Sequence, residues 1–119
     1  MKKVRMVSVL LQDILVSCEL IYDYINGLDY KDFLGSIKAH DCVNRRIEII
    51  GEIVKSLPTM LRTEHPEIPW KSISGMRDIL IHEYYHVDLA LSWNVCQVEI
   101  PKLERLIKKI QKKIDSDNK

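Results

Sequence analysis

Apolar residues recur along the first 26 positions at alternating steps of three and four, which is the spacing of one face of an α-helix. The repeat consists of Val4, Val7, Leu11, Ile14, Cys18, Ile21 and Ile25. This pattern predicts a helix from about Lys3 to Asn26. Gly27 follows at the position where a left-handed C-terminal cap is expected.

A second repeat predicts a helix from about Ile37 to Leu57, with Ser36 as its N-terminal cap and Pro58 as its stop. Its apolar face consists of Val43, Ile47, Ile50, Val54 and Leu57. The interval 28–35 is predicted to be a connection or a short helical turn.

Pro66 and Pro69 interrupt the next interval, 59–69, and predict an irregular connection with about one helical turn. A third helix is expected to begin at Pro69 or Trp70, because proline is favoured at a first helical position. Trp70 is interpreted as a packing residue. The residues expected to face the core from this helix are Ile73, Met76 and Leu80.

The last repeat predicts a helix from Asp88, a good cap, to about Ile114. Its apolar face consists of Leu89, Trp93, Cys96, Ile100, Leu103, Ile107, Ile110 and Ile114. Pro101 lies inside this run and should kink or divide the helix. Four amphipathic helices with mostly short connections predict an all-α, up-and-down four-helix bundle, formed by residues 1–119 as one domain.

Composition narrows the class of protein. Hydrophobic residues make up 46% of the chain and charged residues 29%, as in soluble globular proteins. No apolar run reaches the length of a membrane span, and the N-terminus lacks a signal-peptide pattern, so we expect a cytoplasmic protein without a membrane partner. The three cysteines are odd in number and lack metal-ligand spacing, which favours a structural role and predicts no metal site.

Net charge is only +1, so any contact with nucleic acid must come from a local concentration of charge. The end of the chain is basic, with Lys108, Lys109, Lys112 and Lys113 beside the apolar repeat. These lysines form either an ordinary solvated face or a surface that steers RNA.

The segment with the clearest chemistry is 76–87, Met-Arg-Asp-Ile-Leu-Ile-His-Glu-Tyr-Tyr-His-Val. Arg77 offers a fixed fork of donors that suits phosphate, and His82 can move protons near neutral pH. Together they suit a phosphodiester site that works without a metal, although their spacing alone is more typical of a helix end with an ordinary polar surface. Asp78 lies four positions before His82 and can orient its imidazole. In a continuous helix Arg77 and His82 would point about 140° apart, so the helix must end or distort, or two copies must face each other.

This segment resembles the signature of the HEPN superfamily, and the tyrosine at position 84 is similar to its HepT branch, the toxins of HepT–MntA toxin–antitoxin pairs. The resemblance extends to residues 41–52, which are similar to the family's second helix, and to 66–70 and 75–77, which match its run into the catalytic helix. Arg46 departs from the pattern, where relatives commonly have a smaller polar residue. The resemblance implies a HEPN-like bundle.

The resemblance also implies a metal-independent endoribonuclease that acts as a homodimer on RNA, in which the ribose 2′-hydroxyl attacks the adjacent phosphate. His82 would serve as general base or acid, and Arg77 would stabilise charge on the phosphorane. Arg45 and Glu52 are implied to border the cleft. Their spacing alone is more typical of a solvated, ion-paired face together with Glu48.

For regulation, the resemblance implies that an MntA-like minimal nucleotidyltransferase, the antitoxin, transfers AMP from ATP onto Tyr84. Tyr85 is the neighbouring alternative acceptor. ATP would serve as the partner's AMP donor, so the chain itself is expected to need no cofactor.

Two other classes of function remain open at this point. The chain could be a non-catalytic substrate- or nucleotide-binding subunit of a minimal nucleotidyltransferase, or a helical dimerisation module with an inactive site. The combination of Arg77, His82 and Tyr84 favours the enzyme, because a binding module would not need all three.

Overall fold

The computed structural model describes residues 2–75 and 89–117, and within these ranges it contains helices and no strand. The all-α class predicted from the sequence is confirmed. The predicted first helix is α1, Lys2–Ile25. Gly27 has a φ of 78°, the left-handed conformation expected of the cap that ends it.

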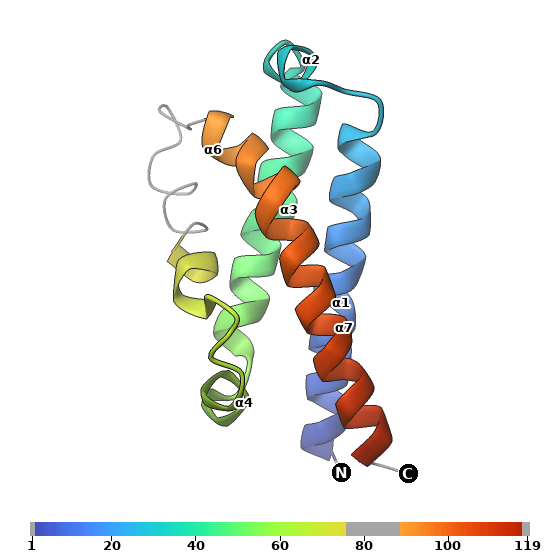
Figure 1. Ribbon diagram of the computed structural model, residues 1–119, viewed down its shortest axis with the longest axis vertical. Coiled ribbons are helices and arrows are strands. Elements are labelled where there is room, and N and C mark those ends of the chain that lie inside the picture. The colour runs from blue at the N-terminus through green and yellow to red at the C-terminus, as the bar shows by residue number, and fades with distance from the viewer. Residues whose placement is uncertain (1, 76–88, 118–119) are drawn as a thin grey trace.

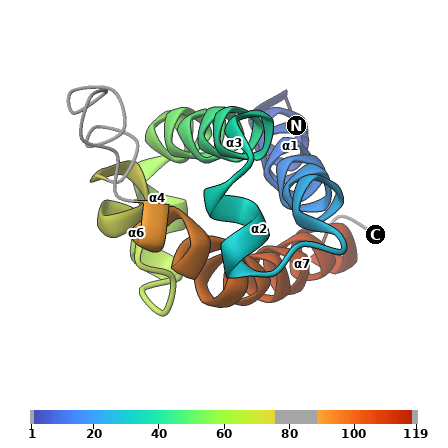
Figure 2. The same ribbon diagram turned by 90° about the horizontal axis from the view of Figure 1, so that it is seen from above.

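The short helix α2, Tyr30–Leu34, lies across one end of the bundle (Figures 1 and 2). Asp29 accepts a hydrogen bond from the Asp32 backbone N–H at 2.8 Å, and Asp32 accepts one in return, which forms a capping box. Phe33 is fully buried, with its ring centroid 5.1 Å from those of His40 and Trp93. Of the two alternatives for residues 28–35, the helical turn is confirmed.

The second predicted helix is α3, Ile37–Ser56, and it begins where Ser36 Oγ accepts a hydrogen bond from the Ala39 backbone N–H at 3.1 Å. It ends before Pro58, as predicted. One short helix follows, α4, Thr59–Glu64, which is the single helical turn expected in this interval.

The last predicted helix is continuous but not uniform. It consists of α6, Leu89–Asn94, the π-helical turn η2, Val95–Glu99, and α7, Ile100–Asp117. The Ile100 backbone N–H donates to the Val95 carbonyl, five residues back, in place of the usual four. The disturbance expected near Pro101 therefore takes the form of a π turn directly before it, which is one way in which a helix accommodates a ring with no N–H to donate.

The core lies between the three long helices. The helix α1 packs against both α3 and α7 and runs in the opposite direction to them (Figure 1). Its buried residues Leu11, Ile14 and Ile21 are fully inaccessible to solvent, as are Val43 of α3 and Ile107 of α7. The predicted third helix begins at residue 70, and positions 70–75 are helical. Its remainder lies outside the described residues, and with it the fourth member of the predicted bundle.

Candidate functional site

The four residues predicted to perform or regulate catalysis, Arg77, Asp78, His82 and Tyr84, lie outside the described residues. Their mutual geometry therefore stays a prediction. The structure describes the two segments that flank them, residues 65–75 before the motif and residues from Leu89 after it.

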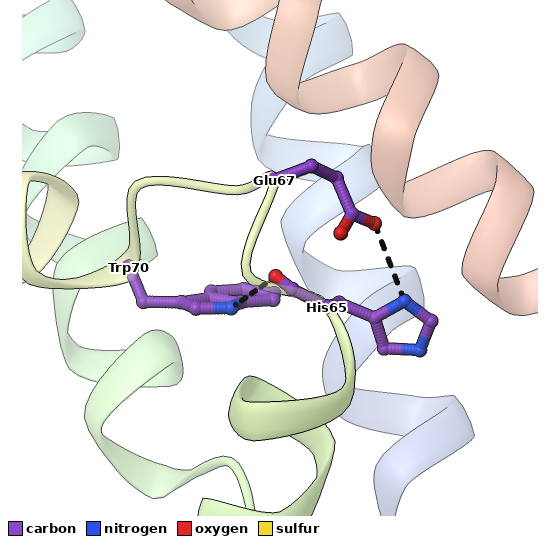
Figure 3. Close-up of polar contacts among 3 residues, drawn as sticks. All are labelled: His65, Glu67 and Trp70. Atoms are coloured by element: carbon purple, nitrogen blue, oxygen red, sulfur yellow. Dashed lines mark hydrogen bonds and ion pairs between the residues drawn. The ribbon is translucent and has the colours of Figure 1, made fainter.

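The segment before the motif is anchored by Trp70, whose indole Nε1 donates to the His65 carbonyl at 2.9 Å (Figure 3). Trp70 is only 7% exposed, which confirms its interpretation as a packing residue. The same His65 carbonyl accepts the Ile68 backbone N–H at 3.3 Å, and Ile68 is buried. Two hydrogen bonds and two buried side chains thus fix the point at which the helix leading to Arg77 begins.

This segment also lies close enough to α7 for the charge of Lys109 to act on Glu67. The His65 imidazole Nδ1 lies 3.3 Å from the Glu67 carboxylate (Figure 3). A hydrogen bond from its own backbone N–H, then His65, and then the charge of Lys109 on α7 lower the pKa of Glu67. The segment that leads to the motif therefore lies within the field of α7.

The segment after the motif is held to α3 by a partly buried hydrogen bond. Ser92 of α6 is 2% exposed, and its Oγ donates to Oδ1 of Asn44 at 2.9 Å. Trp93 beside it packs on Phe33, with Tyr30 at 6.1 Å. The chain is thus fixed on both sides of the motif, and the sequence repeat gave no sign of the Ser92–Asn44 pair because the two residues are 48 positions apart.

Arg45 and Glu52, the predicted border of the cleft, both lie on α3 and are both exposed. The Arg45 guanidinium pairs with the Glu48 carboxylate at 3.3 Å, and the Arg45 side chain is 65% exposed. The ion-paired face that their spacing suggested is therefore present. Such a pair contributes little to stability, so the guanidinium can exchange this partner for another anion. The role at the cleft stays a prediction.

A small gap lies between α3, residues 69–73 and the beginning of α7, with a volume of about 30 Å³. Its lining is mostly apolar, with Ile47, Ile50, Ile73 and Leu103 among the residues around it. A space this size can hold no more than a few water molecules, so it is too small for a nucleotide.

The cysteines do not offer a nucleophile in the buried core. Burial raises the pKa of the thiols of Cys18 and Cys96 to about 12, so both are protonated at neutral pH. Cys42 is half-buried, and all three are free thiols. In the ranges 2–75 and 89–117, no three histidine, cysteine, aspartate or glutamate side chains are grouped to hold a metal ion. No helix within those ranges is long and apolar enough to span a bilayer.

Comparison with known proteins identifies the family. The profile of the family described as "Ribonuclease HepT-like" matches residues 14–110. A "Probable ribonuclease HepT" of Thermococcus cleftensis is 39% identical over 86% of this chain and 93% of its own length. A "Putative RNase" of Caldanaerobacter subterraneus subsp. tengcongensis is 42% identical over 87% of this chain and 92% of its own length.

A longer relative, "Gamma-glutamylcyclotransferase and putative RNase" of Methanocaldococcus jannaschii, is 46% identical over 93% of this chain, which spans only 50% of that protein. No solved structure gives a significant match. The family match covers the second half of α1, all of α3 and most of α7, together with the Arg77–Tyr84 segment between α3 and α7. This chain therefore belongs to the ribonuclease HepT-like family.

Proposed function

We propose that this protein is a metal-independent endoribonuclease toxin. The observation that carries the proposal is the family match over residues 14–110, which includes Arg77 and His82. Relatives that this chain spans almost completely are named as ribonucleases. An arginine for phosphate and a histidine for protons are the two side chains that such a reaction requires.

In the proposed reaction the ribose 2′-oxygen forms a bond to the adjacent phosphorus, and the bond from phosphorus to the 5′-oxygen breaks. His82 takes the proton from the 2′-hydroxyl or supplies one to the leaving 5′-oxygen. Arg77 stabilises the charge that builds on the non-bridging oxygens. One imidazole cannot play both roles at once, so a homodimer with two motifs in one cleft is the proposed active form.

We propose further that Tyr84 is the regulatory residue. Its hydroxyl oxygen would attack the α-phosphorus of ATP held by an MntA-like nucleotidyltransferase, and pyrophosphate would leave. The tethered adenylyl phosphate would then occupy the Arg77 fork at a far higher effective concentration than diffusing RNA. In this proposal the protein itself uses no cofactor, since ATP serves the partner.

Incubation of the purified protein with total cellular RNA, with and without EDTA, tests the ribonuclease. We expect cleavage that survives chelation, is lost in His82→Ala, and leaves DNA intact because DNA lacks the 2′-hydroxyl. A protein that cuts no RNA under any of these conditions would instead be a non-catalytic binding subunit for the nucleotidyltransferase. Cleavage that EDTA abolishes would contradict the metal-independent mechanism.

A further inference from the structure

The strongest concentration of charge in the described structure lies on α7, which forms an outer edge of the bundle (Figure 2). Residues 102–113 contain six of the chain's 18 lysines and arginines and one of its 17 acidic residues, so this segment has a net charge of +5. Because the whole chain is only +1, everything outside this segment sums to −4. The near-neutral net charge of the chain is therefore the sum of a strongly basic segment and an acidic remainder.

Five of these cations share one side of the helix. Successive residues are about 100° apart around an α-helix, which places all five within an arc of about 100° and a length of about 17 Å. We call this set the α7 basic face; it consists of Lys102, Arg105, Lys109, Lys112 and Lys113. The opposite side of α7 is buried in the core through Ile100, Leu103, Ile107 and Ile110. Packing against α1 thus forces the face outward.

The face is exposed and chemically available. All five residues are exposed. Within the described ranges, α7 has an ion pair between Lys108 and Glu104 at 3.9 Å. This pair lies beside the face and involves none of its five cations. The acidic residues of α7, Glu104, Asp115 and Asp117, project outside the arc. Two carboxylates still lie beside the face, because Asp115 lines a surface hollow with Lys112 and Glu99 lines the small gap with Lys102. Cations nevertheless remain in excess, since residues 102–113 have a net charge of +5.

The face adjoins the segment that leads to the motif. Lys102 lines the same small gap as Pro69 and Ile73, and Ile73 is four positions before Arg77. Further along α7, the charge of Lys109 acts on Glu67. The basic face therefore runs beside residues 67–73 along its first two turns and continues past them toward the C-terminal end of the helix.

From this arrangement we infer that the α7 basic face is a binding surface for the sugar–phosphate backbone of RNA. Exposed lysines and arginines suit phosphate contacts, which position a nucleic acid without reading its sequence. A protein partner fits this face poorly, because lysine is depleted in protein–protein interfaces and this arc contains no aromatic or aliphatic anchor. The choice of RNA among polyanions rests on the proposed ribonuclease function.

The test measures binding of a fluorescein-labelled, single-stranded 2′-O-methyl RNA of about 20 nucleotides, which lacks a free 2′-hydroxyl and cannot be cleaved by the proposed reaction. Anisotropy titrations across a salt series compare wild type with Arg105→Gln/Lys112→Gln. Each phosphate contact with a single strand contributes about 0.7 to the slope of log affinity against log salt. We therefore expect the slope to become shallower by about 1.4 and affinity to fall about 25-fold at 0.1 M salt.

Two matched variants make the result specific. Lys31→Gln/Lys38→Gln removes the same charge from exposed positions on α2 and α3 and should leave the slope and affinity close to wild type. The charge-preserving Arg105→Lys/Lys112→Arg should bind almost as wild type, since backbone contacts need charge and not a particular geometry. Circular dichroism checks that each variant retains its helices.

The inference would be overturned if the α7 pair and the control pair lost equal affinity, or if the salt slope of the α7 pair stayed unchanged. It would also be overturned if the wild-type protein failed to bind the probe, which is the result expected of a face that recognises an acidic protein instead. The proposed ribonuclease function can fail independently of this inference. If the probe binds through α7 but the wild-type protein does not cleave natural RNA, the binding surface is supported and the ribonuclease function is rejected.

Discussion

At the scale of the residue, burial decides the chemistry of two of the three cysteines. Cys18 and Cys96 are 0% and 1% exposed, and removal from water disfavours their thiolates. Because both pKa values rise from 9.0 to about 12, these thiols are protonated in folded and unfolded chains alike below about pH 9. Above that pH only the unfolded chain loses their protons. The free energy of unfolding should therefore fall between about pH 9 and 12.

Thiol labelling tests whether Cys18 and Cys96 are buried. With the disulfide reagent DTNB at pH 8, we expect one thiol per chain, that of the half-buried Cys42, to react in the native protein, and all three to react after denaturation. Cys42→Ser should abolish the native signal and keep the other two. Rapid labelling of two thiols in the native protein would show that the core is more open than the structure indicates.

A second prediction at this scale concerns Tyr84. Tyr84→Phe should keep its ribonuclease activity in the presence of the nucleotidyltransferase and ATP, whereas wild type should lose it, because the variant has no hydroxyl to accept AMP. Mass spectrometry of co-expressed protein should place the adduct on Tyr84, with Tyr85→Phe as the matched control. A Tyr84→Phe protein that ATP and the partner still silence would refute the proposed switch.

At the scale of the element, the helix ends are set by short local interactions. Ser36 caps α3, Asp29 and Asp32 form the box that begins α2, and Gly27 takes the conformation that follows α1. The helix α3 also presents Arg45 to solvent and holds α6 through Asn44. A weaker cap on α3 should therefore reduce the stability of the helix on which the predicted cleft border depends.

Ser36→Ala tests this dependence. Loss of the Oγ acceptor leaves the Ala39 N–H without its partner and should lower the free energy of unfolding by about 0.5–2 kcal/mol. Urea denaturation followed by circular dichroism measures the change. Ser56→Ala, at the exposed C-terminal end of the same helix, is the control and should change stability by less than about 0.5 kcal/mol. Equal effects at the two serines would argue against the cap.

At the scale of the whole molecule, α1 is apolar beyond the side that it buries. Its inner residues pack on α3 and α7, yet Met6, Val9 and Val16 are 61%, 52% and 44% exposed. Val98 of the π turn is also half-exposed, at 52%. Apolar surface left outside one bundle can be buried by a second copy of the chain.

We predict a homodimer in solution, with the two Arg77–His82 segments near its two-fold axis. Light scattering at micromolar concentration should give twice the 14.0 kDa mass of the chain. Val16→Lys, which places a charge on the exposed side of α1, tests whether that side contributes to the interface, with Lys38→Gln as a surface control. A single species of 14.0 kDa in wild type would contradict the dimer.

The sequence was sufficient for the local features of the fold. The three-and-four spacing located α1 and α3 to within one residue at each end, because such a face can be buried only in a helix. Ser36, Gly27 and Pro58 marked their boundaries because caps and stops act on the nearest turn. The motif from Arg77 to Tyr84 gave the family, which the comparison confirms, because that likeness resides in residue identity and order.

Only the tertiary structure decided which distant residues meet. Ser92 and Asn44 are 48 positions apart, and no periodicity encodes the hydrogen bond between them. The shared gap that brings Lys102 beside Pro69 and Ile73 was likewise not visible in the sequence. Pro101 predicted a disturbance of the helix but not its form, which is a π turn closed by a hydrogen bond between the buried residues Val95 and Ile100. The basic residues of α7 were visible as a run in the sequence. They became one outward face only because α1 buries the opposite side, and burial is a property of the assembled helices.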